Sequence, residues 1–292
     1  MYSYSFIIPH KNTPHLLQRC VDSIPERDDV QVIVVDDNSD EEKKPSLKEH
    51  KNLQVILLDA TLSKGAGRAR NVGLKHAEGK WLLFPDSDDY YRSEVLDVLD
   101  KYKAKEIDVL YFNFEYRHGI TNEILPALYF NKYFIEYDES AEAVNKLKFH
   151  HNVPWTKMVS HEYIRKNKIT FEETPNGNDI LFSLLVGFYS THIEVSKRIL
   201  YVYNKNVDSL LTKKKHKEEV LCKLTHYIQH NNVYSYIGHS EWKISSLKFL
   251  LHQISNGSFV ENIRLLLFII CKFPEIHRKK NEWVTMLKKK NR

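Results

Sequence analysis

Residues 81–91 read WLLFPDSDDYY, in which a run of large apolar side chains stops at Pro85 and three acids follow. The apolar run is typical of a buried strand. Clustered carboxylates repel one another, and a carboxylate beside an apolar core loses its hydration unless a positive group compensates. The stretch therefore predicts a strand end that meets a cation or another positively charged group.

The first third of the chain alternates such strands with helical patterns. The apolar runs are SFIIP (5–9), QVIVV (31–35), LQVILLD (53–59) and KWLLF (80–84). Apolar spacing predicts a helix over 15–24, and a glycine-rich entry precedes a second helix within 65–80. This order predicts an α/β fold with a parallel central sheet flanked by helices, in which ligands bind at the carboxyl ends of the strands.

The pattern is more mixed after residue 105. Strands are expected at 107–117 and 199–204, and helices at 140–149 and 178–190. From about residue 213 the sequence is helical in period and basic, with no further convincing strand. We therefore expect a domain boundary near residue 210 and a helical extension beyond it.

Composition narrows the class of protein. The apolar share is 42% and the charged share 28%, as in ordinary globular proteins. Three scattered cysteines predict neither a disulfide framework nor a zinc site, and they suit a reducing compartment. The amino terminus lacks the pattern of a signal peptide, and the longest apolar run, LLLFIIC at 265–271, is far short of the roughly 20 residues of a membrane-spanning helix. We expect a cytoplasmic protein.

Basic residues gather late in the chain, at KKKHK (213–217) and in the tail 278–292. One interpretation is a solvated helix face. The other is peripheral attachment to an anionic membrane, such as the inner face of the plasma membrane, at about 1 kcal/mol per basic residue near the surface. The apolar segment 259–273 either packs on the catalytic domain or on a second subunit, as in a homo-oligomer, or takes part in attachment to a membrane that carries a lipid-linked acceptor. No nucleic-acid-binding motif accompanies the charge, so nucleic acid is not an expected partner.

The acids of the opening stretch suit a divalent cation. In an extended segment residues i and i+2 point the same way, so Asp86 and Asp88 would share a face and Asp89 would point elsewhere. Two hard oxygen ligands suit Mg²⁺ or Mn²⁺, which commonly bind one or two carboxylates together with substrate phosphates. The alternative is an acidic turn that caps the next helix.

Two further segments point to the same end of the sheet. VVDDNSD (34–40) places Asp36 and Asp37 at the end of the second strand, although an Asx turn explains them equally well. GAGRARN (65–71) adds arginines at a helix entry, where a phosphate binds readily, although a lone arginine there is usually a surface residue. The order and spacing of the three segments favour a ligand site.

In that order, five segments resemble the amino-terminal half of family 2 glycosyltransferases with the GT-A fold. They are SFIIPHKN, CVDSI, VIVVDDNSD, GAGRARNVGL and AEGKWLLFPDSDDYY. The resemblance is close over 4–91 and looser to about 210. It implies a mostly parallel sheet in a catalytic domain over 1–210, with a nucleotide-sugar half to about 105 and an acceptor half over 106–210, followed by a basic helical extension over 211–292.

The resemblance also implies donor-site roles. Asp36 or Asp37 would hold the uracil of a UDP-sugar, Arg70 would hold the nucleotide, and Asp86 and Asp88 would bind the Mn²⁺ or Mg²⁺ that bridges the diphosphate. The implied nucleotide-sugar contacts further include Pro9, His10, Asn12 and Ser87. Where the family usually has an aromatic residue this chain has Lys11, which cannot stack as a ring does but can reach a phosphate or a base edge. The choice of uridine therefore stays open.

The second half should supply the base and the acceptor pocket. Relatives usually open an apolar helix with an E-D pair, and in PNGNDILFSLL (175–185) Asn178 replaces the first acid while Asp179 is retained. The resemblance makes Asp179 the general base of an inverting transfer; helix capping is the competing explanation. Trp155 and Lys157 in PWTKM resemble a W-x-K element of the acceptor pocket, with core packing as the alternative for Trp155. YNKNVDSLLT (203–212) resembles the segment that closes over the donor.

The function implied is metal-dependent transfer of a hexosyl or N-acetylhexosaminyl group from a UDP-sugar to a hydroxyl of a glycan or lipid-linked acceptor, in cell-surface polysaccharide synthesis. A sugar-nucleotide pyrophosphorylase would need a glycine-rich loop after its first strand, and IIPHKNTPH has no glycine. A membrane-surface binding module with a degenerate fold is the main alternative. Asn178 and Lys11 permit it, and the retained acids and Arg70 argue against it.

Overall fold

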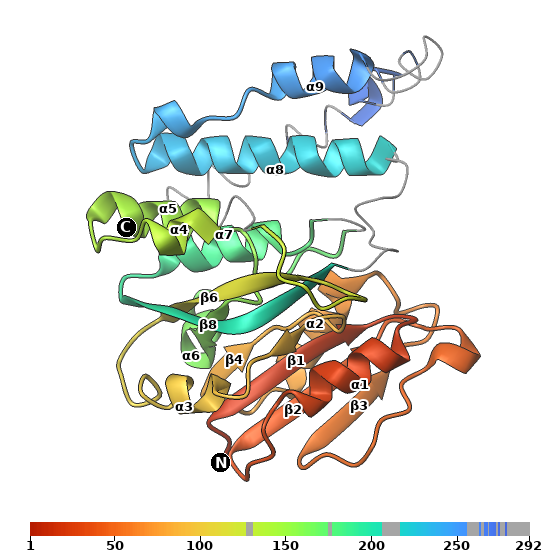
Figure 1. The fold of residues 1–292 in the computed structure, drawn as a ribbon. Helices are drawn as coiled ribbons and strands as arrows, with labels where there is room; N and C mark the ends of the chain where they lie inside the picture. Colours follow the sequence, from red (N-terminus) through yellow and green to blue (C-terminus); the bar gives the residue numbers. More distant parts are fainter. Residues whose placement is uncertain are drawn as a thin grey trace. The chain divides into compact units, whose positions relative to one another are not determined.

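The computed structural model describes residues 1–126, 131–174, 177–205 and 217–255, and isolated helical positions between 263 and 278. The chain forms two compact units (Figure 1). The first contains Met1–Thr174 and Asn178–Thr212, and the second contains Pro175–Gly177 and Lys213–Arg292.

The first unit is built on an eight-stranded sheet of order β3-β2-β1-β4-β7-β6-β8-β5. The strands are β1 (Tyr4–His10), β2 (Val30–Asp36), β3 (Leu53–Leu57), β4 (Trp81–Leu83), β5 (Tyr90–Tyr91), β6 (Val109–His118), β7 (Lys157–Ser160) and β8 (Ile193–Lys205). The first four in spatial order are parallel, and β6 and β8 also pair in parallel. Strand β7 is antiparallel to both its neighbours, and β5 is antiparallel to β8, so the sheet is mixed.

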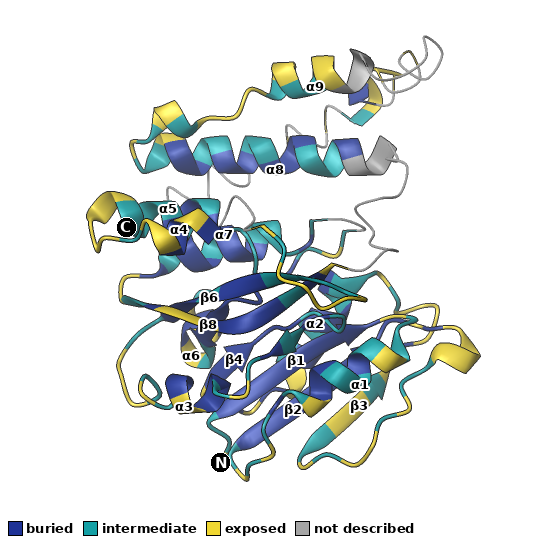
Figure 2. Cartoon of the chain, viewed as in Figure 1, coloured by how far each residue is buried: buried dark blue, intermediate teal, exposed yellow. Residues whose placement is uncertain are grey.

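The four strands expected in the first third are confirmed. Every residue of β1 and β2 is buried, as their continuous apolar sequence predicts. At the edge of the sheet β3 differs, because Val55 and Leu57 are 41% and 55% exposed (Figure 2). The register of β1 and β2 ends with His10 opposite Asp36, which places the polar residues that follow both strands at one end of the sheet.

Helices connect and cover these strands. They are α1 (Pro14–Asp22), α2 (Ala66–His76), α3 (Val95–Leu99), α4 (Lys132–Ile135), α5 (Ala141–His150), α6 (His161–Lys166) and α7 (Ile180–Tyr189), with a 3-10 turn η1 (Glu41–Lys43). Helix α1 buries Leu17, Cys20 and Val21 as its spacing predicts. In α2 a side chain at Gly73 would approach Ile7 Cγ2 to 2.4 Å, so glycine allows this helix to lie close on β1.

The second unit, in its described part, is helical. It contains α8 (Lys217–Tyr236), the 3-10 turn η4 (Ser240–Trp242) and α9 (Ser246–Ser255). Val220, Leu224 and Ile269 form its small apolar cluster. Among the described residues, no helix combines the length and apolar character that crossing a bilayer requires. Residues 213–216 of the basic segment, most of the tail 278–292 and residues 206–212 of the expected donor-closing segment lie outside the described residues.

Candidate active site

The end of β2 is an internally bonded cluster. His10 Nε2 accepts from the Thr13 N–H at 3.1 Å, so Nδ1 carries the proton and donates to Asp36 Oδ1 at 2.7 Å. Asp36 also accepts from the Ser39 hydroxyl at 2.5 Å and from the Ser39 N–H at 2.9 Å. Asp36 and His10 are only 1% exposed, and the carboxylate is held inside the protein by the last residue of β1 and by Ser39 of its own loop.

Asp37, the next residue, bonds the backbone just before α2 begins. Its two oxygens accept from the N–H groups of Lys64 at 3.1 Å and Gly65 at 3.0 Å. Gly65 has φ of 87°, a left-handed conformation that a side chain would strain. The Lys11 ammonium donates to the Asp37 carbonyl oxygen at 2.9 Å and lies 3.6 Å from a carboxylate oxygen. An Asx turn, in which the side chain bonds the backbone two residues on, does not account for Asp37, because its carboxylate bonds N–H groups 27 and 28 residues away.

The remaining residues expected at this end of β1 lie within the same loops. Pro9 is buried in β1. Asn12 has φ of 59°, donates its N–H to the Ser39 hydroxyl at 2.9 Å and accepts from the Asp40 N–H at 2.8 Å. The structure therefore brings Pro9, His10, Asn12 and both acids of the VVDD segment together.

The acids after β4 form a turn, which corrects the extended geometry expected for them. Ser87 and Asp88 occupy its centre, and the Asp89 N–H donates to the Asp86 carbonyl at 3.1 Å. Strand alternation therefore does not set where these side chains point. Asp86, Ser87 and Asp88 are partly exposed, while Asp89 is fully buried. Burial, and then the nearby Asp88 and Asp86 carboxylates, raise the pKa of Asp89 well above its usual value.

Arg70 is the positive group that the opening stretch required. Its side chain is 5% exposed, and Nη2 forms an ion pair with Asp86 Oδ1. Its other terminal nitrogen, Nη1, donates to Asn178 Oδ1 at 2.7 Å, and the guanidinium lies 5.3 Å from the centre of the Phe171 ring. One arginine thus connects the turn after β4 with the residue that precedes Asp179, and we call this pair of contacts, from Arg70 to Asp86 and to Asn178, the Arg70 bridge.

Gly67 and Asn71 allow α2 to pack closely against the segment around Phe171 and Glu172. A side chain at Gly67 would come within 1.9 Å of the Glu172 carbonyl oxygen, so a larger residue would push the helix away. Asn71 accepts from the Phe171 N–H and donates to its carbonyl, each at 2.9 Å. The GAGRARN segment therefore joins two parts of the chain about 100 residues apart, with Arg70 between its two anchors.

Asp179 occupies the cap position of α7, but its side chain makes no capping hydrogen bond. The helix dipole, the other part of the competing explanation, still favours an acid at this position, so the role of Asp179 as a base stays a prediction. It lies near enough to Lys157 to favour the charged ammonium. As the immediate neighbour of Asn178, it stands beside the Arg70 bridge.

The two residues expected in the acceptor pocket are buried. Trp155 is 3% exposed and stacks between Tyr201 and Tyr203, with ring centres 4.9 and 5.5 Å away. Lys157 is fully buried and donates to the backbone carbonyls of His151, at 2.8 Å, and Val153. Burial lowers the pKa of Lys157 to about 7, against a smaller opposing effect of Asp179. Core packing fits Trp155 in this arrangement, and an acceptor contact by either residue stays a prediction.

The residues after β4 fit a hard divalent cation. Asp86 and Asp88 offer only oxygen, lie within one turn and are partly exposed. Among the described residues no group of three or more His, Cys, Asp or Glu side chains is placed to hold a metal ion by itself. Such an ion would take its other ligands from a phosphorylated substrate and water, as Mg²⁺ and Mn²⁺ usually do.

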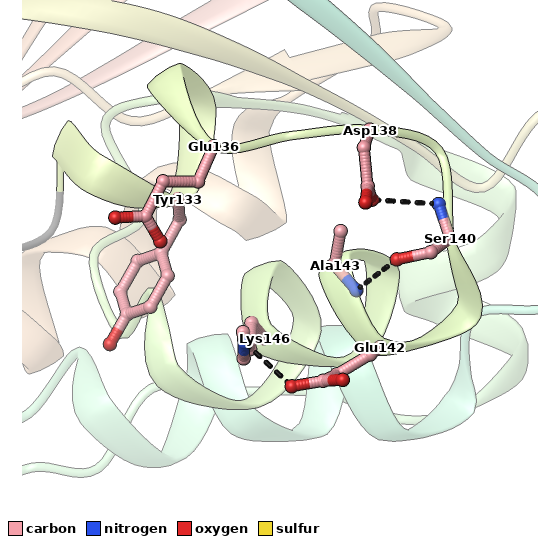
Figure 3. A pocket seen from close by; sticks show the side chains of 7 residues that line it. All are labelled: Tyr133, Glu136, Asp138, Ser140, Glu142, Ala143 and Lys146. Carbon is pink, nitrogen blue, oxygen red and sulfur yellow. Dashed lines mark hydrogen bonds and ion pairs between the residues drawn. The ribbon is translucent and has the colours of Figure 1, made fainter.

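A separate acidic hollow of about 170 Å³ lies at α4 and α5 (Figure 3). Its polar groups pair with one another: Lys146 contacts Glu142 at 2.7 Å, and Asp138 accepts from the Ser140 N–H at 3.0 Å. None of the expected site residues lines it. The candidate site is therefore the strand-end region.

Two further residues of this region belong to none of the sequence motifs described above. Arg19 of α1 donates to the Asp88 carbonyl at 2.7 Å and covers the Tyr90 ring at 4.7 Å. Tyr201 of β8 accepts from the Asp86 N–H at 3.0 Å. Their partners lie 69 and 115 residues away, so only the fold reveals them.

The sheet, its strand-end acids and the Arg70 bridge define a GT-A glycosyltransferase. The family described as Glycosyl transferase family 2 matches residues 5–167, more than half of the chain. This protein belongs to glycosyl transferase family 2.

Curated relatives agree in class. The poly(ribitol-phosphate) β-N-acetylglucosaminyltransferase TarS of Staphylococcus aureus is 29% identical over 214 residues, which cover 70% of this chain and 35% of TarS. The poly(ribitol-phosphate) β-glucosyltransferase of Bacillus spizizenii is 28% identical over 207 residues, covering 68% of this chain and 32% of that protein. The chain thus matches only about a third of the length of these relatives.

Solved structures show the same fold. TarS 1–349 of S. aureus in complex with UDP-GlcNAc aligns with a TM-score of 0.66 at 20% identity, covering 98% of this chain and 89% of that one. The mannosyltransferase PcManGT of Pyrobaculum calidifontis, in complex with GDP-Man and Mn²⁺, aligns with a TM-score of 0.52 at 17% identity, covering 98% and 84%.

Proposed function

We propose that this glycosyltransferase moves a sugar from a nucleotide-diphosphate donor, a UDP-sugar by preference, to a hydroxyl of a glycan or lipid-linked acceptor in cell-surface polysaccharide or teichoic-acid synthesis. The observation that carries the proposal is the Arg70 bridge, which joins Asp86 to Asn178 beside Asp179. A donor diphosphate and a base are thereby expected at neighbouring points.

The donor would lie along the carboxyl ends of β1, β2 and β4. The loop of Asp36 and Asp37, with Pro9, His10 and Asn12, would hold the base, and Arg70 and Ser87 would lie toward the diphosphate. Asp86 and Asp88 would hold a Mn²⁺ or Mg²⁺ ion, whose charge stabilises the departing diphosphate. The ion pair of Asp86 with Arg70 leaves both charges close to the expected phosphates.

The acceptor would be deprotonated by Asp179. Its carboxylate would take the proton of the attacking hydroxyl, whose oxygen bonds to the anomeric carbon from the face opposite the diphosphate. The bond from that carbon to the diphosphate oxygen breaks with its electron pair leaving on the diphosphate, and the centre is inverted. The position of Asp179 supports this role, because it directly follows Asn178, the residue that Arg70 bonds. Trp155 and Lys157 would support the acceptor side from within, since both are buried.

Nucleotide binding tests the donor half. UDP at 100 times its Kd should raise the melting temperature by about 5 °C in Mn²⁺, and by much less in EDTA. In Asp88→Ala, UDP should no longer raise the melting temperature more in Mn²⁺ than in EDTA. A protein that no nucleotide stabilises, with or without metal, would contradict the proposal.

Turnover tests the base. Asp179→Asn should reduce kcat by roughly 10²–10⁴-fold while UDP binding is kept, because only proton removal is lost. Asp138→Asn, in the hollow of Figure 3, is the matched control and should leave kcat unchanged. Near-normal turnover of the Asp179→Asn variant would show that Asp179 is not the general base. UDP binding without turnover of any sugar nucleotide would favour the degenerate binding module.

We further propose that the second unit attaches to an anionic membrane. Six apolar side chains of its described helical residues are at least 41% exposed: Leu247, Leu251, Ile263, Leu266, Leu267 and Ile270. The last four follow i, i+3, i+4, i+7 spacing, and the tail after them has seven basic residues against one acid.

Vesicle sedimentation tests this attachment. The protein should sediment with phosphatidylglycerol vesicles more than with phosphatidylcholine, and Leu267→Glu with Ile270→Glu should abolish the difference. Val55→Glu with Leu57→Glu, on exposed positions of β3, is the matched control. Unchanged vesicle binding of the first double variant, with a smaller sedimentation coefficient in solution, would instead assign the surface to a second copy of the chain.

A further inference from the structure

The turn after β4 is held by one tyrosine hydroxyl. Tyr201 Oη accepts from the Asp86 N–H at 3.0 Å and donates to Asp89 Oδ2 at 2.8 Å. The other oxygen of Asp89 accepts from the Asn204 N–H at 2.7 Å. A single hydroxyl of β8 thus bonds both ends of the turn that carries Asp86 and Asp88.

Neither Asp89 nor Tyr201 can touch a ligand as they are placed. Both are fully buried, and Asp89 has both oxygens engaged inside the protein. A buried carboxylate is costly unless it is hydrogen-bonded, so the structure keeps an expensive group at this position. Helix capping does not account for it, because its partners lie 112 and 115 residues away on β8.

The tyrosine ring is itself fixed on both sides. It stacks on Trp155 with ring centres 4.9 Å apart and an angle of 16°, and it meets the edge of Tyr91 at 5.2 Å. The hydroxyl therefore stands at a defined point, and the turn bonded to it has little freedom to shift.

We propose that Asp89 and Tyr201 are positioning residues for the metal end of the donor site, an inference that rests on the proposed function. Ions such as Mg²⁺ demand near-ideal ligand geometry, so the carboxylates of Asp86 and Asp88 must be presented by a backbone that does not move. Groups that orient metal ligands typically contribute 10- to 100-fold in metal affinity. Asp89 thus holds the backbone of the turn so that Asp86 and Asp88 keep the positions needed to bind the ion.

Tyr201→Phe tests this directly, because it keeps the stacked ring and removes only the hydroxyl. The Kd of Mn²⁺ is measured by electron paramagnetic resonance of the free ion, in the presence of saturating UDP. We expect the Kd to rise about 10- to 100-fold. Asp89→Asn, which keeps one acceptor oxygen, is the second variant and should raise the Kd less; it also serves if Tyr201→Phe does not fold.

Tyr163→Phe is the matched control. Its hydroxyl donates to the Val186 carbonyl at 2.7 Å in a buried place outside the turn, so its loss removes a comparable hydrogen bond. A merely structural Tyr201 would match this control, with a lower melting temperature and an unchanged Kd for Mn²⁺, and that result would overturn the inference alone. Failure of the wild-type protein to bind UDP with Mn²⁺ would instead overturn the proposed function and this inference with it.

Discussion

Two acidic turns flank β1 at the same end of the sheet, one after β2 and one after β4. In the first, Asp36 and Asp37 are bound by His10, Ser39 and the entry to α2, all within 28 residues. In the second, the acids meet Arg70 of α2 and residues of β8, up to 115 residues away. The two turns look alike in sequence, but the first is built from its own neighbourhood and the second from the whole domain.

This difference predicts different roles for the two turns, stability for the first and ligand binding for the second. Asp36, Asp37 and Ser39 of the first turn are buried and bonded inside the protein, so these two acids shape a loop whatever else they bind. The second leaves Asp86, Ser87 and Asp88 partly exposed. Substitutions in the first turn should therefore affect mainly stability, and substitutions in the second mainly ligand binding.

Asp36→Ala should have the largest effect on stability. It leaves the His10 N–H and two donors of Ser39 without their acceptor in a buried place, which should lower the free energy of unfolding by about 3 kcal/mol. Urea denaturation measures it, with Asp40→Ala, an exposed acid paired to Lys43, as a control expected to cost less than about 0.5 kcal/mol. Equal losses in the two variants would end the distinction between buried and exposed acids of this turn.

Lys157 is a buried charged group like Asp36, but the partners of its hydrogen bonds are backbone carbonyls. Its pKa of about 7 lies below the unfolded value of 10.5, so between these values the unfolded chain binds the extra proton and stability rises with pH. From pH 7 to 9 this group alone should add about 2 kcal/mol to the free energy of unfolding. Subtracting the profile of Lys157→Met isolates the effect, and parallel profiles would show that the ammonium keeps its proton throughout.

Asn178 probes the far end of the Arg70 bridge. Asn178→Ala leaves one buried guanidinium nitrogen without its acceptor and should cost about 1 kcal/mol, measured by urea denaturation. Asn178→Asp keeps an acceptor oxygen and should retain most of that stability. If the aspartate variant were the worse of the two, the bridge would depend on a neutral partner for Arg70.

Lys11 should matter least to the fold. Its side chain is 52% exposed and 3.6 Å from the Asp37 carboxylate, so Lys11→Met should change the free energy of unfolding by less than about 0.5 kcal/mol. A loss above 1 kcal/mol would place Lys11 inside the bonded network of the first turn. An altered preference between UDP and GDP in the same variant would assign it to base recognition.

Local pattern was sufficient for the framework. Strands β1, β2 and β4 and helices α1, α5 and α7 follow from apolar runs or spacing, because each buries apolar side chains. Strand β3 follows from its apolar run although it lies half-exposed at the sheet edge, and α2 follows from its glycine-rich entry. The two-residue β5, the short β7 and the brief helices α3, α4 and α6 carry too few residues to show a period. They exist because strands already in place offer hydrogen bonds or apolar surface to them.

The sequence by itself determined an α/β domain, its strand-end acids, the GAGRARN entry and the family. Those features depend on neighbours within a few residues, which the order of amino acids displays directly. Only the tertiary structure decided that Arg70 joins Asp86 to Asn178, that Lys157 is buried, and that Asp89 bonds to Tyr201. The bonds of Arg70 to Asn178 and of Tyr201 to Asp89 join groups 108 and 112 residues apart, and burial of Lys157 requires the folded domain around it, so none of them shows in the local order of amino acids.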